Sequence, residues 1–322
     1  MYFFSIVRTF LILLLSFFVK LSLLIVIVIF ISQLLRMFLP YMFFTPEYYV
    51  KKLKFEEQKD QIDLVFLGTS RTNYGINPSI FEQVLANKST QKLRTYNLGM
   101  AGSSIGEIVA LSKQLLNDDN TFKGKYMIVE LMPVAHAVSE QFCGQTNIHT
   151  NRNAYWASWD MLKFNVGNIM AENEKRYSDF RKFSLATNYA TQFVHNQFNM
   201  AMFEDYIAIK ANHKKTLGQF GLSKKGFRPN KGKKKKGKPA EVQKWVQKSL
   251  QQPIKRRREA SIKAFSQPKP NAFVNQHFLE ELKSLQLLAK EKGKEMIFLV
   301  PPLLSPEQYL DIRAIYDKLP QR

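Results

Sequence analysis

Short apolar runs alternate with amphipathic segments in two parts of the chain, residues 62–132 and 271–322. The apolar runs have the length of strands and predict four buried strands, at Ile62–Leu67, Thr95–Met100, Tyr126–Met132 and Met296–Val300. Apolar positions at helical spacing predict helices at Pro78–Lys88, Ser104–Asn117, Val274–Lys292 and Pro306–Leu319. Such alternation is typical of an α/β fold, in which helices cover both faces of a parallel sheet.

Two of these helices have clear boundary signals. Asn77 and Pro78 predict the start of the helix at 78–88, because asparagine caps helix N-termini and proline fits the first helical position. Gly293 predicts the end of the helix at 274–292, because glycine commonly follows the last helical residue.

The longest apolar run lies at the N-terminus, from Thr9 to Leu35, and Lys20 is its only charged residue. A membrane-spanning helix needs about 20 apolar residues. The run is longer than the roughly 7–15 apolar residues of a signal peptide, and no Ala-x-Ala cleavage pattern follows it. We therefore expect residues 1–44 to be a retained single-pass anchor in contact with membrane lipid.

Basic residues flank both ends of this run, so the sequence does not fix its orientation. Arg8 and Lys20 precede its most apolar part, whereas Arg36, Lys51 and Lys52 follow it. The positive-inside rule taken alone leans slightly toward a cytoplasmic body.

Two further segments lie outside the α/β core: one follows the anchor, and the other interrupts the core. Residues 45–61 mix aromatic and charged side chains, and we expect a stalk there. Residues 133–270 interrupt the strand–helix alternation as a long insertion with a predicted helix at Ala186–Ala211. Lysine and glycine at the density found in Gly221–Pro239 bury little surface, so we expect this tract to be disordered.

The formal net charge of +21 is concentrated in the insertion. From His213 to Lys263 there are eighteen Lys or Arg against two Glu, a net of +16, which leaves +5 for the rest of the chain. A uniformly basic nucleic-acid-binding protein is therefore excluded, and nucleic acid is not expected as a partner. The stretch Lys231–Lys238 either contacts an anionic lipid surface or polymer, or is a solvated linker.

Cysteine and histidine give no sign of a metal or redox centre. The single cysteine, Cys143, cannot form an internal disulfide, and no Cys/His cluster has the spacing of zinc ligands. We expect no metal and no other cofactor.

Small, turning segments follow two of the predicted strands. In DLVFLGTSRTNYGINP, residues 63–78, Gly68, Thr69 and Ser70 end the first strand. Asn97 and Gly99 end the second, and ligands of α/β proteins bind at such carboxyl ends of strands. Two interpretations remain open: Ser70 is presented for chemistry, or these residues only form strand-to-helix turns.

The blocks GTS at 68–70 and NLGMAG at 97–102 resemble the SGNH/GDSL hydrolase superfamily, most closely its membrane-anchored envelope branch. The resemblance covers Ile62–Met132 and, more loosely, Val274–Leu304. It implies a three-layer α/β/α sandwich around a parallel, flavodoxin-like sheet. It also implies cleavage or transfer of ester-linked acyl groups, often on carbohydrate.

Carried over by position, the resemblance makes Ser70 the nucleophile, and a serine hydroxyl needs a base to take its proton. The backbone N–H groups of Ser70 and Gly99 would form the oxyanion hole. Glycine at position 99 would leave the backbone open to the substrate.

The sequence departs from the family pattern in three places. Thr69 replaces the usual aspartate beside the nucleophile. After the third strand, Glu130 and the following residues offer no asparagine for the oxyanion hole. The family's Asp-x-x-His, which lies beyond a fifth strand, is missing, so we expect the core to be incomplete at its C-terminus and the chain alone to be inactive. His136 is a candidate substitute base, or an ordinary surface-loop residue.

Four more residues are candidates for substrate binding. Arg71 would bind an anionic group or pair with a nearby carboxylate, and the ion pair is favoured. Asn97 lies in the second block. Trp156 and Trp159 would stack on sugar rings or, with more support, pack locally within the insertion.

These observations favour a membrane-anchored acyl esterase or O-acyltransferase that acts on cell-envelope or exported polysaccharide. The resemblance puts the globular body outside the cytoplasmic membrane, and we follow it over the ambiguous charge pattern. One alternative is a non-catalytic envelope protein that keeps the sheet. Another is a polyanion or membrane-surface binder that uses the Lys-rich tract.

Overall fold

The core of the protein is a four-stranded parallel sheet. The computed structural model describes residues 2–38, 46–117, 122–132, 158–171, 178–197, 225–226, 256, 259, 262–263, 266, 274–301 and 312–320. The strands are paired in the order β2-β1-β3-β4. Their bounds are Leu64–Leu67 for β1, Thr95–Asn97 for β2, Tyr126–Glu130 for β3 and Glu295–Leu299 for β4. The predicted α/β class with a parallel sheet is therefore confirmed, and all four strands lie within the predicted runs or one residue beyond them.

Strand register brings apolar side chains into rows across the sheet. Val65 lies opposite Tyr96 and Met127, and Met127 lies opposite Met296. Because side chains alternate between the two faces of a strand, Leu67 and Val65 point to the same side. These buried side chains form one face of the hydrophobic core.

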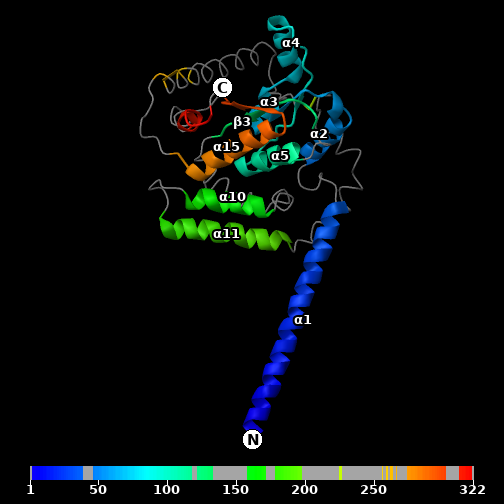
Figure 1. Ribbon diagram of the computed structural model, residues 1–322, viewed down its shortest axis with the longest axis vertical. Coiled ribbons are helices and arrows are strands. Elements are labelled where there is room, and N and C mark those ends of the chain that lie inside the picture. The colour runs from blue at the N-terminus through cyan, green and yellow to red at the C-terminus, as the bar shows by residue number, and fades with distance from the viewer. Residues whose placement is uncertain are drawn as a thin grey trace, which may run out of the picture.

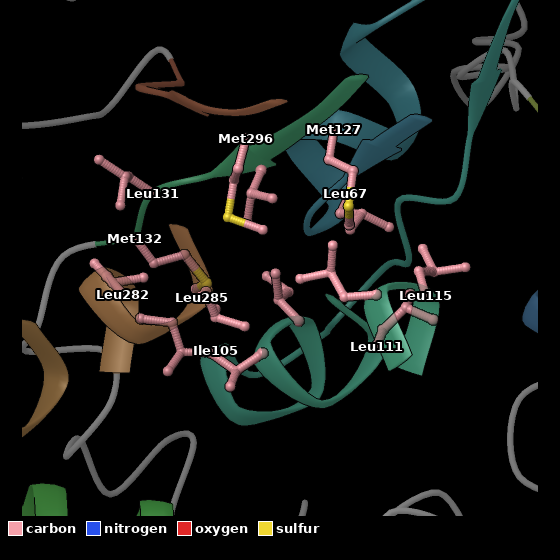
Figure 2. Packing of buried hydrophobic residues seen from close by; sticks show 14 of the residues in the cluster. Leu67, Ile105, Leu111, Leu115, Met127, Leu131, Met132, Leu282, Leu285 and Met296 are labelled. Carbon is pink, nitrogen blue, oxygen red and sulfur yellow. The ribbon is translucent and has the colours of Figure 1, made fainter. Parts of the chain in front are cut away.

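Two amphipathic helices pack on that face: α5 (Ile105–Asn117) and α15 (Gln276–Glu291). Figure 2 shows Leu67, Met127 and Met296 of the sheet pointing toward side chains of both helices. The side chains from the two helices include Ile105, Leu111, Leu115, Leu282 and Leu285. The spacing of these residues is helical, which is why the sequence pattern predicted both helices.

A different helix, α4 (Pro78–Lys88), packs against β2. Its Phe81 ring lies edge-on to Phe66 of β1, with ring centroids 5.1 Å apart. The predicted N-cap is confirmed, because the Asn77 side chain accepts a hydrogen bond of 3.0 Å from the N–H of Ser79.

The N-terminal helix α1 spans Tyr2–Phe38 and projects from the body (Figure 1). Its segment Val7–Leu34, 28 residues long, is apolar enough to cross a membrane and lies outside the protein interior. A membrane anchor and a signal sequence both have these properties.

The segment expected as a stalk is packed into the body instead. It forms α2 (Pro46–Glu56) and a short 3-10 helix at Lys59–Gln61. Tyr48, Val50 and Phe55 of α2 are buried, and the Phe55 ring contacts Tyr96 of β2 at 5.4 Å between centroids. Tyr48 and Phe55 are seven residues apart and therefore lie on the same side of α2, and both belong to the hydrophobic core.

Two helices from the insertion add a further layer beside α5 and α15. They are α10 (Trp159–Met170) and α11 (Asp179–Gln197). Figure 1 shows α10 between α11 and the pair α5 and α15, and α10 contacts all three. The helix predicted at Ala186–Ala211 therefore begins earlier, at Asp179, and its part after Gln197 lies outside the described residues.

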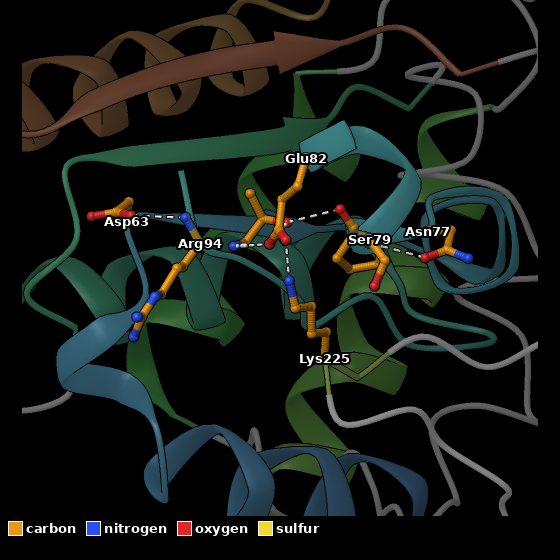
Figure 3. A network of polar contacts seen from close by, with 8 residues as sticks. Asp63, Asn77, Ser79, Glu82, Arg94 and Lys225 are labelled. Carbon is orange, nitrogen blue, oxygen red and sulfur yellow. Dashed lines mark hydrogen bonds and ion pairs between the residues drawn. The ribbon is translucent and has the colours of Figure 1, made fainter. Parts of the chain in front are cut away.

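One short part of the Lys-rich region is docked on the sheet. The N–H of Asn97 donates a hydrogen bond of 3.0 Å to the carbonyl oxygen of Lys225, on the edge of β2 away from β1. Lys225 also pairs with Glu82 of α4, as Figure 3 shows. Lys225 and Gly226 thus correct the expectation of disorder for Gly221–Pro239, because a backbone hydrogen bond and an ion pair both fix them. The remainder of that tract lies outside the described residues.

Candidate functional site

Ser70 lies at the carboxyl end of β1, where it begins the short helix α3 (Ser70–Gly75). Thr69 caps this helix, and its hydroxyl accepts a hydrogen bond of 3.2 Å from the N–H of Arg71. The Ser70 side chain is half-buried. Within the described ranges its hydroxyl makes no hydrogen bond, whereas the hydroxyl groups of Thr69 and Thr72 are both engaged.

A buried carboxylate, Glu130 at the end of β3, holds the segment around Ser70. Its Oε2 accepts hydrogen bonds from the N–H of Thr69 at 2.8 Å and from the hydroxyl of Thr72 at 2.7 Å. Its Oε1 accepts one from the Thr69 hydroxyl at 2.8 Å and lies 3.5 Å from Nη1 of Arg71. A buried carboxylate needs such partners, so Glu130 ties the turn after β1 to β3.

Gly68 makes this contact possible. A Cβ at position 68 would lie 2.1 Å from Oγ1 of Thr72 and 2.4 Å from Oε2 of Glu130. Any side chain there would displace the carboxylate from its donors. The glycine that precedes Thr69 and Ser70 is therefore required by the close approach of Glu130.

The end of β2 reaches the same helix. A Cβ at Gly99 would lie 2.8 Å from the backbone nitrogen of Asn73 and 2.8 Å from Cγ2 of Thr72. Gly99 thus lies against Thr72 and Asn73 of α3, which follow Ser70 by two and three residues. The sheet therefore brings the two sequence blocks together, as the parallel arrangement predicts.

The polar groups of Asn97 and Gly99 are occupied by the protein itself. The Asn97 side chain donates to the carbonyl oxygens of Thr72 and Ile76, both at 2.8 Å. Its Oδ1 accepts the N–H of Gly99 at 2.8 Å. In this arrangement the N–H that the resemblance assigns to an oxyanion is directed at Asn97, and Asn97 is fully buried.

A buried lysine of α2, Lys51, connects α3 with the loop after β2. Nζ of Lys51 donates to Oδ1 of Asn73 at 2.7 Å and to the carbonyl oxygen of Gly99 at 2.5 Å. Nδ2 of Asn73 in turn donates to Glu47 at 2.7 Å. The segment between the apolar helix and the sheet therefore contributes directly to the geometry beside Ser70.

Tyr96 of β2 connects this group of polar residues to the hydrophobic core. Its hydroxyl donates to the carbonyl oxygen of Lys51 at 2.7 Å. Burial raises the pKa of Tyr96 well above its usual range, and the nearby carboxylate of Glu57 raises it further. Tyr96 is therefore a neutral hydrogen-bond donor at physiological pH.

The structure places the other predicted residues as follows. Arg71 forms the favoured type of contact, an ion pair with Glu130. Trp159 begins α10, and its ring packs against Phe193 of α11 with centroids 4.6 Å apart, which agrees with local packing. His136, Trp156 and Lys231–Lys238 lie outside the described residues.

No side chain in the described part of the chain is hydrogen-bonded to the Ser70 hydroxyl as a base would be. The histidine whose side chain is described there, His277 of α15, lies against Gly167 of α10, because a Cβ on that glycine would come within 2.4 Å of its Nε2. The described residues also contain no group of three or more His, Cys, Asp or Glu side chains that could hold a metal ion.

Sequence reasoning missed the roles of Glu130 and Lys51. Glu130 carried a usable signal, because a carboxylate in the apolar run YMIVELM would be buried and would need donors. Lys51 carried none, since it lies among several lysines in a segment of mixed character.

The chain was compared with protein-family models, with curated proteins and with solved structures, and none of them matches it. The fold and the contacts around Ser70 are therefore the basis for any functional conclusion.

Proposed function

We propose that the protein is a single-pass membrane protein whose extracytoplasmic body is an SGNH-like serine acyl esterase or O-acyltransferase. Its substrate would be an ester-linked acyl group on cell-envelope or exported polysaccharide. The body would be a three-layer α/β/α sandwich, of which the parallel sheet and the helices α4, α5 and α15 are the supporting features.

The observation that carries this proposal is the position of Ser70. It is a half-buried serine at the carboxyl end of β1, and its hydroxyl is not used in the described structure, although its neighbours Thr69 and Thr72 are both bonded to Glu130. Gly99 of the second sequence block lies against the same helix. Ligand sites of parallel α/β sheets lie at this edge.

A second function, that of a non-catalytic envelope protein, is favoured by the hydrogen bonds of Gly99. Its N–H donates to Asn97 and its carbonyl oxygen accepts from Lys51, so both polar groups serve the fold. An oxyanion hole requires donors that point at the developing charge. If this arrangement persists in the cell, Asn97, Lys51 and Asn73 are structural residues.

Labelling with a fluorophosphonate probe distinguishes the two functions. The full chain is treated in the membranes of the cells that produce it, since such probes react with activated serine hydroxyls. Because a serine hydroxyl needs a base to react, the chain is extended at its C-terminus by one strand and an Asp-x-x-His loop. We expect covalent labelling of this extended chain and none of its Ser70→Ala variant. Ser79→Ala is the matched control, because Ser79 is an exposed serine in the first turn of α4 and only its backbone N–H is bonded to Asn77.

Three extended proteins are compared: the one with the native residues, Ser70→Ala and Ser79→Ala. Labelling of Ser79→Ala at the native level, with loss in Ser70→Ala, would support the esterase or acyltransferase. Labelling of Ser70→Ala at the native level would remove Ser70 from the mechanism. Absence of labelling in all three, with the proteins folded and present at equal levels, would favour the non-catalytic function.

A further inference from the structure

Helix α11 is buried on one side and apolar on the other. Leu185 and Phe193 are buried, with Tyr189 packed against the core beside them. The opposite side presents six exposed, uncharged residues, each three or four positions from another of the set. We call them the α11 outer face: Phe180, Phe183, Thr187, Ala190, Thr191 and Val194. Residues at such intervals lie on one side of a helix.

This face differs from that of an ordinary surface helix, which exposes charged and polar residues. Phe180 is 82% exposed, Phe183 is 67% exposed and Val194 is 52% exposed. The Asp, Lys and Arg residues of α11 are confined to its first turn, where Asp179, Arg181 and Lys182 lie. Exposed apolar side chains gathered on one surface are typical of sites that contact another protein or a membrane.

The place of α11 in the molecule indicates that partner. The helix contacts α1, whereas the sheet lies on the far side of α10 (Figure 1). In Figure 1, α11 runs across the direction of α1 at the end where α1 enters the body, and α1 extends away from the body beyond it. Most of α1 therefore lies on one side of α11, and the sheet lies on the other side (Figure 1).

We propose that the α11 outer face rests on the surface of the lipid bilayer that α1 crosses. This inference depends on the proposal that α1 is a membrane anchor. The apolar segment Val7–Leu34 has 28 residues. At about 1.5 Å per residue it is roughly 40 Å long, about 10 Å more than the hydrocarbon core. The surplus extends into the headgroup region, where α11 meets α1.

The contact is apolar rather than electrostatic. An interfacial helix buries its apolar face roughly 5–10 Å deep at the boundary between headgroups and acyl chains. The two phenylalanines and Val194 are the side chains that would enter this boundary. Because α11 has so few charged residues, the contact does not depend on anionic lipid, in contrast to a contact made by the Lys-rich tract.

Depth-dependent fluorescence quenching tests the contact. The full chain carrying Cys143→Ser receives a single new cysteine, Phe183→Cys, which is labelled with an environment-sensitive NBD fluorophore. The labelled chain is reconstituted into phosphatidylcholine vesicles with or without spin-labelled lipid. We expect a blue-shifted emission and a loss of emission when the spin-labelled lipid is present.

Ile80→Cys is the matched control. Ile80 is an apolar residue of α4 that is 57% exposed, comparable to Phe183, and Figure 1 places α4 at the end of the body away from α1. Its label should emit as in water and should keep its emission with spin-labelled lipid. Equal quenching at positions 80 and 183 would overturn the inference.

A third label, at Ile25→Cys within α1, separates this inference from the anchor proposal. Quenching at position 25 without quenching at position 183 would leave the anchor intact and overturn the contact of α11 with lipid. No quenching at either position would contradict both. Quenching at 183 only in vesicles with anionic phosphatidylglycerol, or cross-linking of Phe183→Cys between two copies of the chain in place of quenching, would also overturn the inference.

Discussion

Glu130 has the central role among the residues at the strand ends. It is buried at the end of β3 and binds the turn after β1 through Thr69, Thr72 and Arg71. The carboxylate is 61 residues away from Thr69 in the sequence, so this contact joins two separate strand–helix units. It also fixes the first turn of α3, in which Ser70 lies.

Replacing Glu130 by glutamine tests this role. The amide keeps the shape of the side chain but places an NH₂ group against donors, so charge-assisted bonds are lost and one donor faces another. Hydrogen bonds to buried charged groups contribute about 1.5–3 kcal/mol, so we expect Glu130→Gln to lower the free energy of unfolding by about 2 kcal/mol. Urea unfolding of the full chain in detergent, followed by circular dichroism, measures this change.

The control for this substitution is Glu295→Gln. Glu295 lies 3.4 Å from Lys125 in a partly exposed ion pair at the start of β4. Exposed pairs contribute less than about 1 kcal/mol, so Glu295→Gln should unfold at nearly the native urea concentration. Equal shifts for the two variants would contradict a special role for Glu130.

At the scale of elements, a segment of the insertion is docked on the edge of the sheet. Lys225 and Gly226 lie along β2, and Gly226 has a positive φ of +77°. A Cβ at position 226 would lie 2.4 Å from the carbonyl oxygen of Asn97. This residue must therefore be glycine for two reasons, its backbone conformation and its close approach to β2.

Gly226→Ala should detach the segment from β2. The substitution adds left-handed backbone strain of roughly 1–2 kcal/mol and a backbone clash, and 1.4 kcal/mol corresponds to a factor of ten in an equilibrium. We expect hydrogen exchange of the Asn97 amide to become about tenfold or more faster, because that amide donates to Lys225. Hydrogen–deuterium exchange of the full chain measures it.

Gly293→Ala provides the matched control at the element scale. Gly293 also has a positive φ, of +66°, but a Cβ there would meet no atom within 4 Å. The substitution should cause backbone strain without changing exchange at Asn97. A similar acceleration in both variants would mean that general destabilisation, and not detachment of Lys225 and Gly226, exposes the amide.

At the scale of the whole molecule, α1 contacts the body at α11. The next described helix after α1 is α2, which begins at Pro46 and whose Lys51 binds the loop after β2. The length and apolarity of α1 are those of a membrane anchor and also those of a signal sequence.

We predict a retained anchor with an extracytoplasmic body. Alkaline phosphatase fused after Arg322 should be active, because this reporter folds only outside the cytoplasm, and the same fusion without residues 2–38 should be inactive. The intact mass of the membrane-bound chain should include α1. An active cytoplasmic reporter at the same position would reverse the orientation, and a mass that lacks α1 would indicate a signal sequence.

The local elements could be predicted from the sequence alone. The apolar run from Thr9 to Leu35 predicted α1, the runs of strand length predicted the four strands, and Asn77 with Pro78 predicted the start of α4. These features depend on residues that are close in the chain, where periodicity, caps and turns act. Parallel pairing followed from the alternation, so the sequence also indicated that the ends of β1 and β2 meet.

Only the tertiary structure shows which polar groups are bonded within the protein and that the α11 outer face is exposed. Lys51 binds the carbonyl oxygen of Gly99, 48 residues away, and Lys225 pairs with Glu82 from a tract whose composition indicated disorder. The outer face of α11 is visible as such only once its opposite side is known to be packed. Burial, hydrogen-bond partners and exposure depend on contacts between distant segments, and no local pattern records them.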